Sequence, residues 1–281
     1  MTDRSVRRPA AIDACDRFAP LRGELGALLA GLGAGDWERP TAAGQWSVKD
    51  VAAHLLGGDV GILSRRRDGV RGPGAPVRTH ADLVRLVDRL NAEWVVAMRR
   101  ASPRLLVELL AVTGPAVEAY FASLDPTAMG EPVSWAGPDP APVWFDLARE
   151  FTERWHHQQQ IRDATGRPPL YEPYYLSPVL DTFVRALPHG FRTVRAAEDT
   201  TVRFEISGKA GGVWFVVRGA RVWELVLDAP REPVADVVVS EDVAWRMFTK
   251  GVDRQRARRA AAVRGAVEFA DPIFATVAVI G

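Results

Sequence analysis

Two residues four positions apart in one long predicted helix carry side chains that can bind a metal. Residues 142–166 predict this helix, because Pro142 suits a first turn, Gly166 suits a left-handed C-terminal cap, and two further prolines follow. Within it, Glu153 and His157 are one turn apart, so a carboxylate and an imidazole share one face. Both groups are common ligands of divalent transition metals.

A third ligand is available from an earlier helix. Ser47, with Asp50 three residues later, predicts an N-terminal cap, and the helix that follows runs to about residue 67. His54 lies beside the apolar arc of this helix. The residues that share its side are Gly57, Gly58 and Gly61. Each glycine costs about 1 kcal/mol relative to alanine inside a helix, which predicts open space or a closely packed partner beside the imidazole.

Two histidines and one carboxylate are the ligand set of catalytic zinc sites that keep a fourth position open. Helical bundles build such sites from side chains on facing helices. His54, Glu153 and His157 also have a simpler interpretation, because a Glu–His pair on a helix is often solvated and a single histidine often makes a structural hydrogen bond. Spacing alone leaves both interpretations open. The remaining histidines, which we expect at the surface, are His80, His156 and His189.

The elements around these residues predict an α+β protein of two domains. Residues 1–166 contain four or five amphipathic helices, which is enough for an antiparallel four-helix bundle. In residues 167–281 the hydrophobic period changes from 3.6 to 2. The predicted strands are 202–206, 213–217, 222–227 and 235–239. A helix capped by Ser240 follows, so the second domain is expected to be α+β with a mainly antiparallel sheet.

Composition excludes several classes of function. The 281 residues are 47% hydrophobic and 25% charged, with a net charge of +1. We find no apolar run of about 18 residues and no signal-peptide pattern, so we expect a cytoplasmic protein that does not bind membranes. The basic residues are almost all arginine, which suits a GC-rich bacterial genome, and the balanced charge argues against a nucleic-acid partner. Cys15 is the only cysteine, which excludes internal disulfides.

Read together, several stretches resemble a known family. They are WSVKDVAAHLLGGDVGILSRRRDG, EFTERWHHQQQIRDATGRPP, the lead-in DWERPTAAGQW and the SWAG loop. They resemble the mycothiol-dependent maleylpyruvate isomerase family, in which a DinB-like metal-binding four-helix bundle precedes a sterol-carrier-like domain. The resemblance covers nearly the whole chain. It implies that His54, Glu153 and His157 are metal ligands, that the metal is Zn²⁺, and that mycothiol or a similar low-molecular-weight thiol is the cofactor.

The resemblance also implies further site residues. Family members carry a functional arginine after the helix that reads DVAWRMFTKG here, where this chain has Lys250, with Arg246 one turn earlier as the alternative. Lysine keeps the charge but lacks the planar fork that binds a carboxylate with two hydrogen bonds. Gly58 is expected to leave room for the thiol. Trp135 is expected either to line the pocket or simply to pack. Asp59, five residues after His54, is a weaker candidate for supporting the metal ligands and is expected to hydrogen-bond to solvent instead.

The sequence therefore predicts a metal-dependent enzyme that uses mycothiol for isomerisation or S-transfer on a small, electrophilic, anionic substrate, as a monomer or homodimer. Two alternatives remain. One is a metal-dependent hydrolase in which Glu150 or Asp146 is the base. The other is a non-catalytic small-ligand-binding protein with a structural or vestigial metal. Thiol-dependent turnover, thiol-free hydrolysis and co-purification of an apolar ligand would distinguish the three.

Overall fold

A computed structural model describes residues 6–71 and 78–279, which fall into two compact units. The helical unit comprises residues 13–128 and 149–170. The sheet unit comprises residues 6–12, 129–148 and 171–279. The predicted cut at residue 166 lies close to residue 171, where the chain enters the sheet unit. As a domain boundary it stays a prediction.

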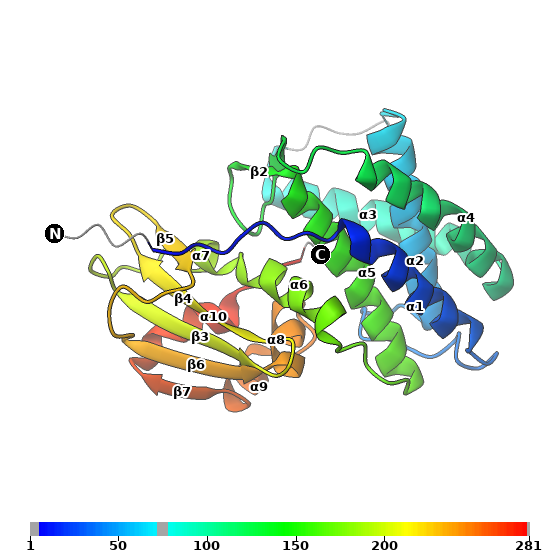
Figure 1. Cartoon of the computed structure of the whole chain (residues 1–281). Coiled ribbons are helices and arrows are strands. Elements are labelled where there is room, and N and C mark those ends of the chain that lie inside the picture. The colour runs from blue at the N-terminus through cyan, green and yellow to red at the C-terminus, as the bar shows by residue number, and fades with distance from the viewer. Residues whose placement is uncertain (1–5, 72–77, 280–281) are drawn as a thin grey trace. The chain divides into compact units, whose positions relative to one another are not determined.

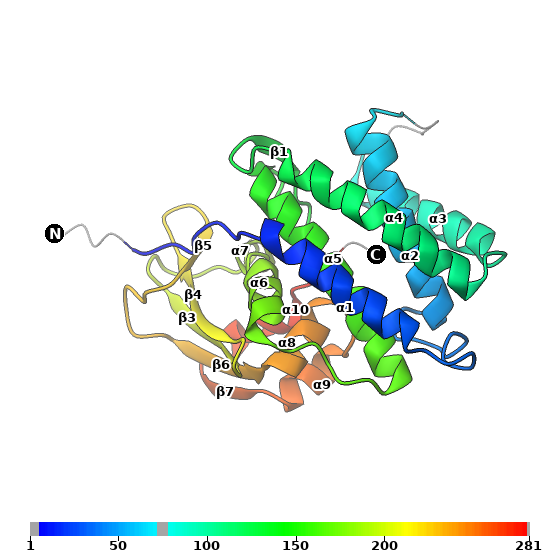
Figure 2. The ribbon, with the colours of Figure 1, turned by 45° about the vertical axis from the view of Figure 1, so that its right-hand side comes forward.

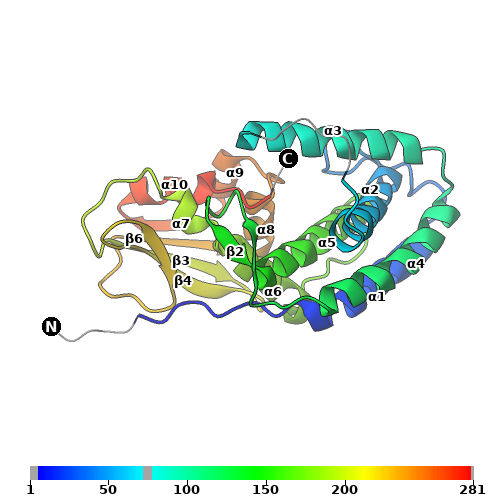
Figure 3. The same ribbon diagram turned by 90° about the horizontal axis from the view of Figure 1, so that it is seen from above.

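The helical unit contains the predicted antiparallel four-helix bundle, which is confirmed (Figures 1 and 2). Its elements are η1 (Cys15–Arg17), α1 (Phe18–Ala30), α2 (Val48–Gly61), the π-helix η2 (Ile62–Arg67), α3 (His80–Met98), α4 (Pro103–Ala122) and most of α5 (Val143–Thr165). Figure 3 shows α2 between α3 and α4, with α1 alongside α4. Helix α2 is therefore covered by neighbours on more than one side.

Local sequence signals explain the two helices that carry the candidate ligands. The Ser47 hydroxyl accepts a hydrogen bond from the Asp50 N–H, and the Asp50 carboxylate accepts one from the Ser47 N–H, which is the predicted capping box. The apolar arc of α2 enters the bundle core, where Val51 and Leu55 are buried. Helix α5 ends where Gly166 takes a φ of +65°, a left-handed conformation that glycine adopts without strain.

Helix α4 combines length with an apolar composition. Its 20 residues include an 18-residue window of mean hydropathy 1.5, which meets the length and composition of a membrane-spanning helix. Helices in the core of soluble proteins meet the same criterion, and α4 contacts α1 and α2 within the bundle.

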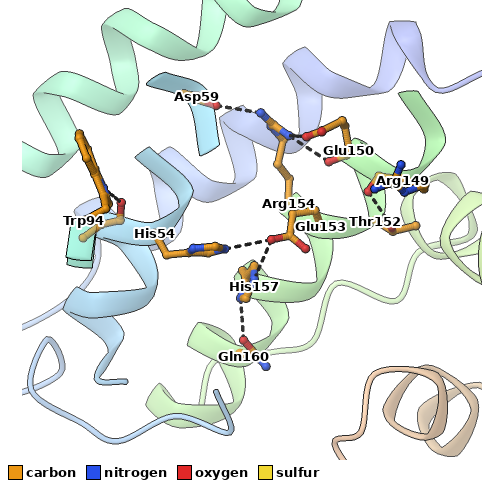
Figure 4. A network of polar contacts seen from close by, with 11 residues as sticks. His54, Asp59, Trp94, Arg149, Glu150, Thr152, Glu153, Arg154, His157 and Gln160 are labelled. Atoms are coloured by element: carbon orange, nitrogen blue, oxygen red, sulfur yellow. Dashed lines mark hydrogen bonds and ion pairs between the residues drawn. The ribbon is translucent and has the colours of Figure 1, made fainter. Parts of the chain in front are cut away.

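A buried ion pair joins α2 to α5 next to the candidate ligands (Figure 4). Asp59 Oδ1 accepts a 2.9 Å hydrogen bond from Arg154 Nη2, and Asp59 Oδ2 accepts one of 2.8 Å from the Thr113 hydroxyl on α4. Arg154 also pairs with Glu150, one turn earlier, at 2.9 Å. The Asp59 side chain is 7% exposed. The prediction that Asp59 bonds to solvent is wrong, because α5 places a guanidinium directly opposite it.

The sheet unit is built on five strands in the order β5-β4-β3-β6-β7. They are β3 (Thr201–Ser207), β4 (Gly212–Arg218), β5 (Trp223–Val226), β6 (Ala235–Ser240) and β7 (Ala262–Gly265). The β3–β6 pair is parallel and the other three pairs are antiparallel, which confirms the mainly antiparallel sheet. The β4–β5 hairpin is the antiparallel pair predicted from 213–217 and 222–227.

Shorter elements complete the sheet unit. They are α6 (Pro173–Val184), α7 (Leu187–Gly190), α8 (Glu241–Phe248), α9 (Arg254–Arg259), η3 (Val267–Phe269), α10 (Asp271–Ala275) and the small hairpin of β1 (Met129–Pro132) and β2 (Pro140–Pro142). Ser240 caps α8 as predicted. Helix α6 begins at Pro173, which suits the first turn of a helix. The sequence did not predict β1, β2, β7 or α9, which are too short to show a period.

The ion pair between α2 and α5 predicts a specific pattern of stability. Arg154→Met removes the partner of the buried Asp59 carboxylate, so we expect the free energy of unfolding to fall by about 3–5 kcal/mol. Chemical denaturation measures it. Asp59→Asn in the Arg154→Met background removes the unpaired charge and should recover part of that loss. Additive losses in the double variant would show that the two residues do not interact.

Candidate metal centre

His54, Glu153 and His157 meet between α2 and α5 (Figure 4). Glu153 Oε1 lies 3.0 Å from Nε2 of His54 and 3.0 Å from Nε2 of His157. One possible ligand atom from each residue lies within 4.8 Å of the other two. Ligand atoms around a tetrahedral zinc ion are about 3.4 Å apart, given metal–ligand bonds near 2 Å. The three side chains therefore have close to the spacing that a metal requires.

Neighbouring side chains orient both imidazoles. Gln160 Oε1 lies 2.8 Å from His157 Nδ1 and accepts the N–H of that nitrogen, which directs Nε2 toward Glu153. Trp46 packs on His54, with ring centroids 4.9 Å apart. A fixed acceptor on the far ring nitrogen is the usual way in which proteins hold a metal-binding histidine. Gln160 thus occupies the position of such an acceptor.

Sequence reasoning assigned no role to Gln160 or Trp46, although each gives a signal. Gln160 is three residues after His157, a spacing that brings two side chains together on a helix. Trp46 immediately precedes the N-cap of α2, the position from which an apolar residue packs back on the first turns.

The charges of the three residues depend on one another. Burial opposes ionisation of Glu153, but attraction to His157 and hydrogen bonds with both imidazoles outweigh it and hold the Glu153 pKa well below its usual range. Burial also disfavours a charged His157, yet the Glu153 carboxylate, helped by Gln160, raises the pKa of His157. Burial lowers the pKa of His54 despite its hydrogen bond with Glu153. His54 is therefore the neutral imidazole, and His157 holds a proton that a metal would displace.

The site is enclosed on the histidine side and more open at the carboxylate. The His54 side chain is 11% exposed, whereas that of Glu153 is 43% exposed. Gly57 and Gly58 of α2 lie in different surroundings. A Cβ on Gly57 would lie 2.6 Å from Trp94, so close packing requires glycine there. A Cβ on Gly58 would meet no atom within 4 Å, so Gly58 borders open space.

The other predicted site residues belong to the sheet unit. Trp135 is buried and packs edge-to-face on Phe145, with ring centroids 5.4 Å apart. Trp135 therefore has the packing role that was one of its two expected roles. The other, lining a pocket for the thiol, stays a prediction. Arg246 Nε donates to Asp242 at 3.0 Å, and its guanidinium lies 4.3 Å from the centroid of the Trp245 ring. Arg246 is therefore part of the local packing of α8.

Lys250 closes α8 in an unusual conformation. It is exposed and has a φ of +62°, in the left-handed region that favours glycine. The Gly251 N–H donates to the Arg246 carbonyl at 2.7 Å, which is the cap of a helix that ends through a left-handed residue. A non-glycine residue in this conformation costs about 1–3 kcal/mol. Glycine occurs one position later, so lysine occupies the strained position itself.

Two sequence-based expectations about this region need correction. His156 was predicted at the surface but is 7% exposed, because α5 is covered on more faces than its apolar arc alone. Glu150 was one of two predicted bases of a hydrolase, with Asp146, but it pairs with Arg154 at 2.9 Å and lies 3.7 Å from Arg66. Two guanidiniums therefore engage the Glu150 carboxylate. His189 is partly exposed, and the side chain of His80 lies outside what the structure describes.

This chain resembles a known family in sequence and solved structures in fold. Residues 18–162, just over half of the chain, match the sequence family described as the mycothiol maleylpyruvate isomerase N-terminal domain. The fold resembles a crystal structure of the mycothiol-dependent maleylpyruvate isomerase, with a TM-score of 0.52 and 11% identity over 85% of this chain and 88% of that chain. A histidine-to-alanine mutant of that isomerase gives a TM-score of 0.51 with the same identity and coverage. No curated protein matches this chain in sequence.

The shared charges of the site predict a pH-dependent contribution to stability in metal-free protein. The raised pKa of His157 stabilises the fold below its ordinary value of 6.5, and this contribution is lost as pH rises through the raised pKa. The lowered pKa of Glu153 stabilises the fold above its ordinary value of 4.5, and this is lost as pH falls. The pair therefore stabilises most between these two values.

Glu153→Gln should accordingly lower the free energy of unfolding by about 1 kcal/mol in that window, a modest value because solvent screens a half-exposed carboxylate. The loss should shrink as pH rises through the raised pKa of His157, because the imidazole then becomes neutral. Denaturation in the presence of a chelator measures both. The matched control is Glu108→Gln, which removes an exposed carboxylate paired with Arg104. A loss that does not change with pH would contradict the assigned protonation states.

Proposed function

Because this chain belongs to the family of the mycothiol maleylpyruvate isomerase N-terminal domain, we propose that it is a metal-dependent enzyme that uses a low-molecular-weight thiol, with mycothiol as the first candidate. The proposal rests on one observation above all, the convergence of two imidazoles and a carboxylate within 4.8 Å. These residues lie inside the stretch that matches the family. His54, Glu153 and His157 would hold the metal, for which Zn²⁺ is the first candidate.

The donor set fits such a metal. Imidazole nitrogen and carboxylate oxygen are zinc ligands, and three protein ligands leave a fourth position for an exogenous group. When bound, the metal favours the thiolate form of a coordinated thiol near neutral pH, which supplies a nucleophile for isomerisation of a conjugated double bond or for S-transfer. The protein's own thiol is poorly suited to that role, because burial and nearby carboxylates raise the pKa of Cys15.

The chain's own contribution is to hold these groups in place. Gln160 keeps the Nδ1 proton on His157 and leaves Nε2 directed at the site. Burial lowers the pKa of His54, so that ring is neutral and carries a single proton, which Nε2 donates to the Glu153 carboxylate in the metal-free protein. The open space beside Gly58 supports its proposed role in admitting the thiol. The exposed side of Glu153 is the direction from which small molecules would approach.

Lys250 is the residue that we propose binds an anionic group of the substrate. Its left-handed backbone costs free energy that glycine would avoid, and strained conformations of this kind concentrate at functional sites. A functional requirement for the ammonium group would explain why lysine is retained there. Arg246 is the weaker candidate, because Asp242 and Trp245 already engage its guanidinium.

The alternatives have less support. Hydrolysis would need a general base. Of the two candidates, Glu150 is engaged by two arginines, and Asp146 belongs to the sheet unit rather than to the helical unit. A purely binding role would require that the three candidate ligands hold a structural or vestigial metal. Substrate identity, monomer or homodimer, cytoplasmic location and the expected lack of nucleic-acid and membrane partners all stay predictions.

The proposed metal site predicts that replacing a ligand and replacing a residue that orients a ligand have different effects on metal binding. Purified protein should contain about one equivalent of divalent metal by elemental analysis, and His54→Ala should lose both the metal and thiol-dependent turnover of maleylpyruvate. Gln160→Leu keeps all three ligands, so it should bind metal about 10- to 100-fold more weakly, as measured by chelator competition. Gln255→Leu on α9 is the matched control and should bind as the parent does. Equal metal affinity in the Gln160→Leu variant would exclude Gln160 as the orienting group.

The proposed role of Lys250 predicts opposite effects on stability and on substrate binding. Lys250→Gly relieves the left-handed strain, so we expect the free energy of unfolding to rise by about 1 kcal/mol. It also removes the charge, so KM for an anionic substrate should rise about tenfold while metal content stays unchanged. Lys209→Ala, the control, should change neither. A stabilised Lys250→Gly variant with unchanged KM would show that the lysine has no part in substrate binding.

A further inference from the structure

The sheet unit contains a charged feature that the proposed function does not use. A hollow of about 510 Å³ lies where the segment after α7 meets the end of β4. Its lining residues are Arg192, Thr193, Val194, Arg195, Ala196 and Arg218. Three of these six residues are arginines, and none of the six is acidic.

The backbone under the arginines is held by specific contacts. The Val194 carbonyl accepts a 3.1 Å hydrogen bond from Trp223 Nε1, and the Val194 N–H donates to the Phe191 carbonyl at 2.8 Å. The Phe191 and Trp223 rings pack together with centroids 4.9 Å apart. Arg218 ends β4, and its N–H donates to the Thr200 carbonyl at 2.9 Å. The hollow is therefore anchored to the sheet on both sides.

Acidic residues lie near the lining segment in sequence or across the sheet, namely Glu198, Asp199 and Glu224, but among the described residues they are not paired with the arginines of the hollow. In the part of the chain that the structure describes, no ion pair within 4.0 Å involves Arg192, Arg195 or Arg218. Nη1 of Arg192 donates to the His189 carbonyl at 2.8 Å, and Nη1 of Arg218 donates to the Gly219 carbonyl at 2.7 Å. These bonds orient two guanidiniums and use one nitrogen of each. The nearby Asp199 is engaged by Arg231 at 3.0 Å.

We propose that this hollow is a binding site for a small, multiply charged oxyanion of the class that includes phosphate esters and polycarboxylates. Three arginines line one hollow, and a bound anion would offset the repulsion between their like charges. A ligand with several charged oxygens can accept paired hydrogen bonds from more than one guanidinium. Thr193, whose side chain carries a neutral donor, also lines the hollow. This site is independent of the proposed metal chemistry.

Calorimetric titration of the full chain with pyrophosphate, and separately with citrate, tests the proposal at a constant ionic strength of about 0.15 M. We expect saturable binding of one equivalent of at least one probe. Binding of pyrophosphate alone identifies a phosphate ligand, and binding of citrate alone identifies a polycarboxylate. Arg192→Gln, Arg195→Gln and Arg218→Gln should each weaken binding about five- to tenfold.

The matched control is Arg259→Gln, which removes an exposed arginine elsewhere in the same unit and should leave affinity unchanged. His157→Ala should also leave it unchanged, which separates this site from the metal centre. Thermal unfolding of each variant without ligand checks the fold, and Arg192 and Arg195 are exposed enough to be replaced if Arg218→Gln unfolds. The proposal would be overturned if neither probe showed saturable binding, or if Arg259→Gln weakened binding as much as the three variants of the hollow. The arginines would then be ordinary solvated surface charges.

Discussion

Two consecutive residues of α5 fix that helix against α2, and the candidate site depends on both contacts. Glu153 meets His54 at 3.0 Å, and Arg154 meets Asp59 at 2.9 Å. His54 and Asp59 are five residues apart on α2, so α2 cannot slide or rotate against α5 without breaking at least one contact. Buried ion pairs contribute little net stability, because desolvation offsets their attraction. In this account the Asp59–Arg154 pair serves mainly to align the two helices.

The charged residues that align α2 with α5 are distinct from those that could bind a metal. Asp59, Arg154, Glu150 and Arg66 contribute two charges of each sign, so that network is neutral. The Glu153 carboxylate lies outside this neutral network, and its Oε1 is within hydrogen-bonding distance of both imidazoles. Without a metal, a proton on His157 satisfies the carboxylate, and a cation placed among the same atoms would replace it. The same three side chains can thus exist in two states with little movement of the helices that carry them.

Helical periodicity predicts which residues share a face, but it does not predict which neighbour covers that face. Periodicity was sufficient to predict that Glu153 and His157 share a face of α5, and the capping box predicted where α2 begins. Bundle geometry allowed His54 to join Glu153 and His157 but left a structural alternative open, and the family resemblance was needed to favour the metal site, because no spacing within one helix identifies a residue on another. His156 was wrongly placed at the surface for the same reason, since its burial depends on what lies opposite. Likewise, only Trp94 on α3 distinguishes Gly57 from Gly58.

The most direct test of this account is X-ray absorption spectroscopy at the zinc edge of protein loaded with one equivalent of Zn²⁺. The account predicts nitrogen and oxygen ligands at about 2.0–2.1 Å, with the outer-shell scattering of two imidazoles and no sulfur. Addition of a low-molecular-weight thiol should introduce one sulfur ligand at about 2.3 Å while both imidazoles remain. A spectrum with fewer than two imidazoles, or one in which the thiol adds no sulfur, would contradict the central claim that α2 and α5 present a three-ligand site with one position for a thiol.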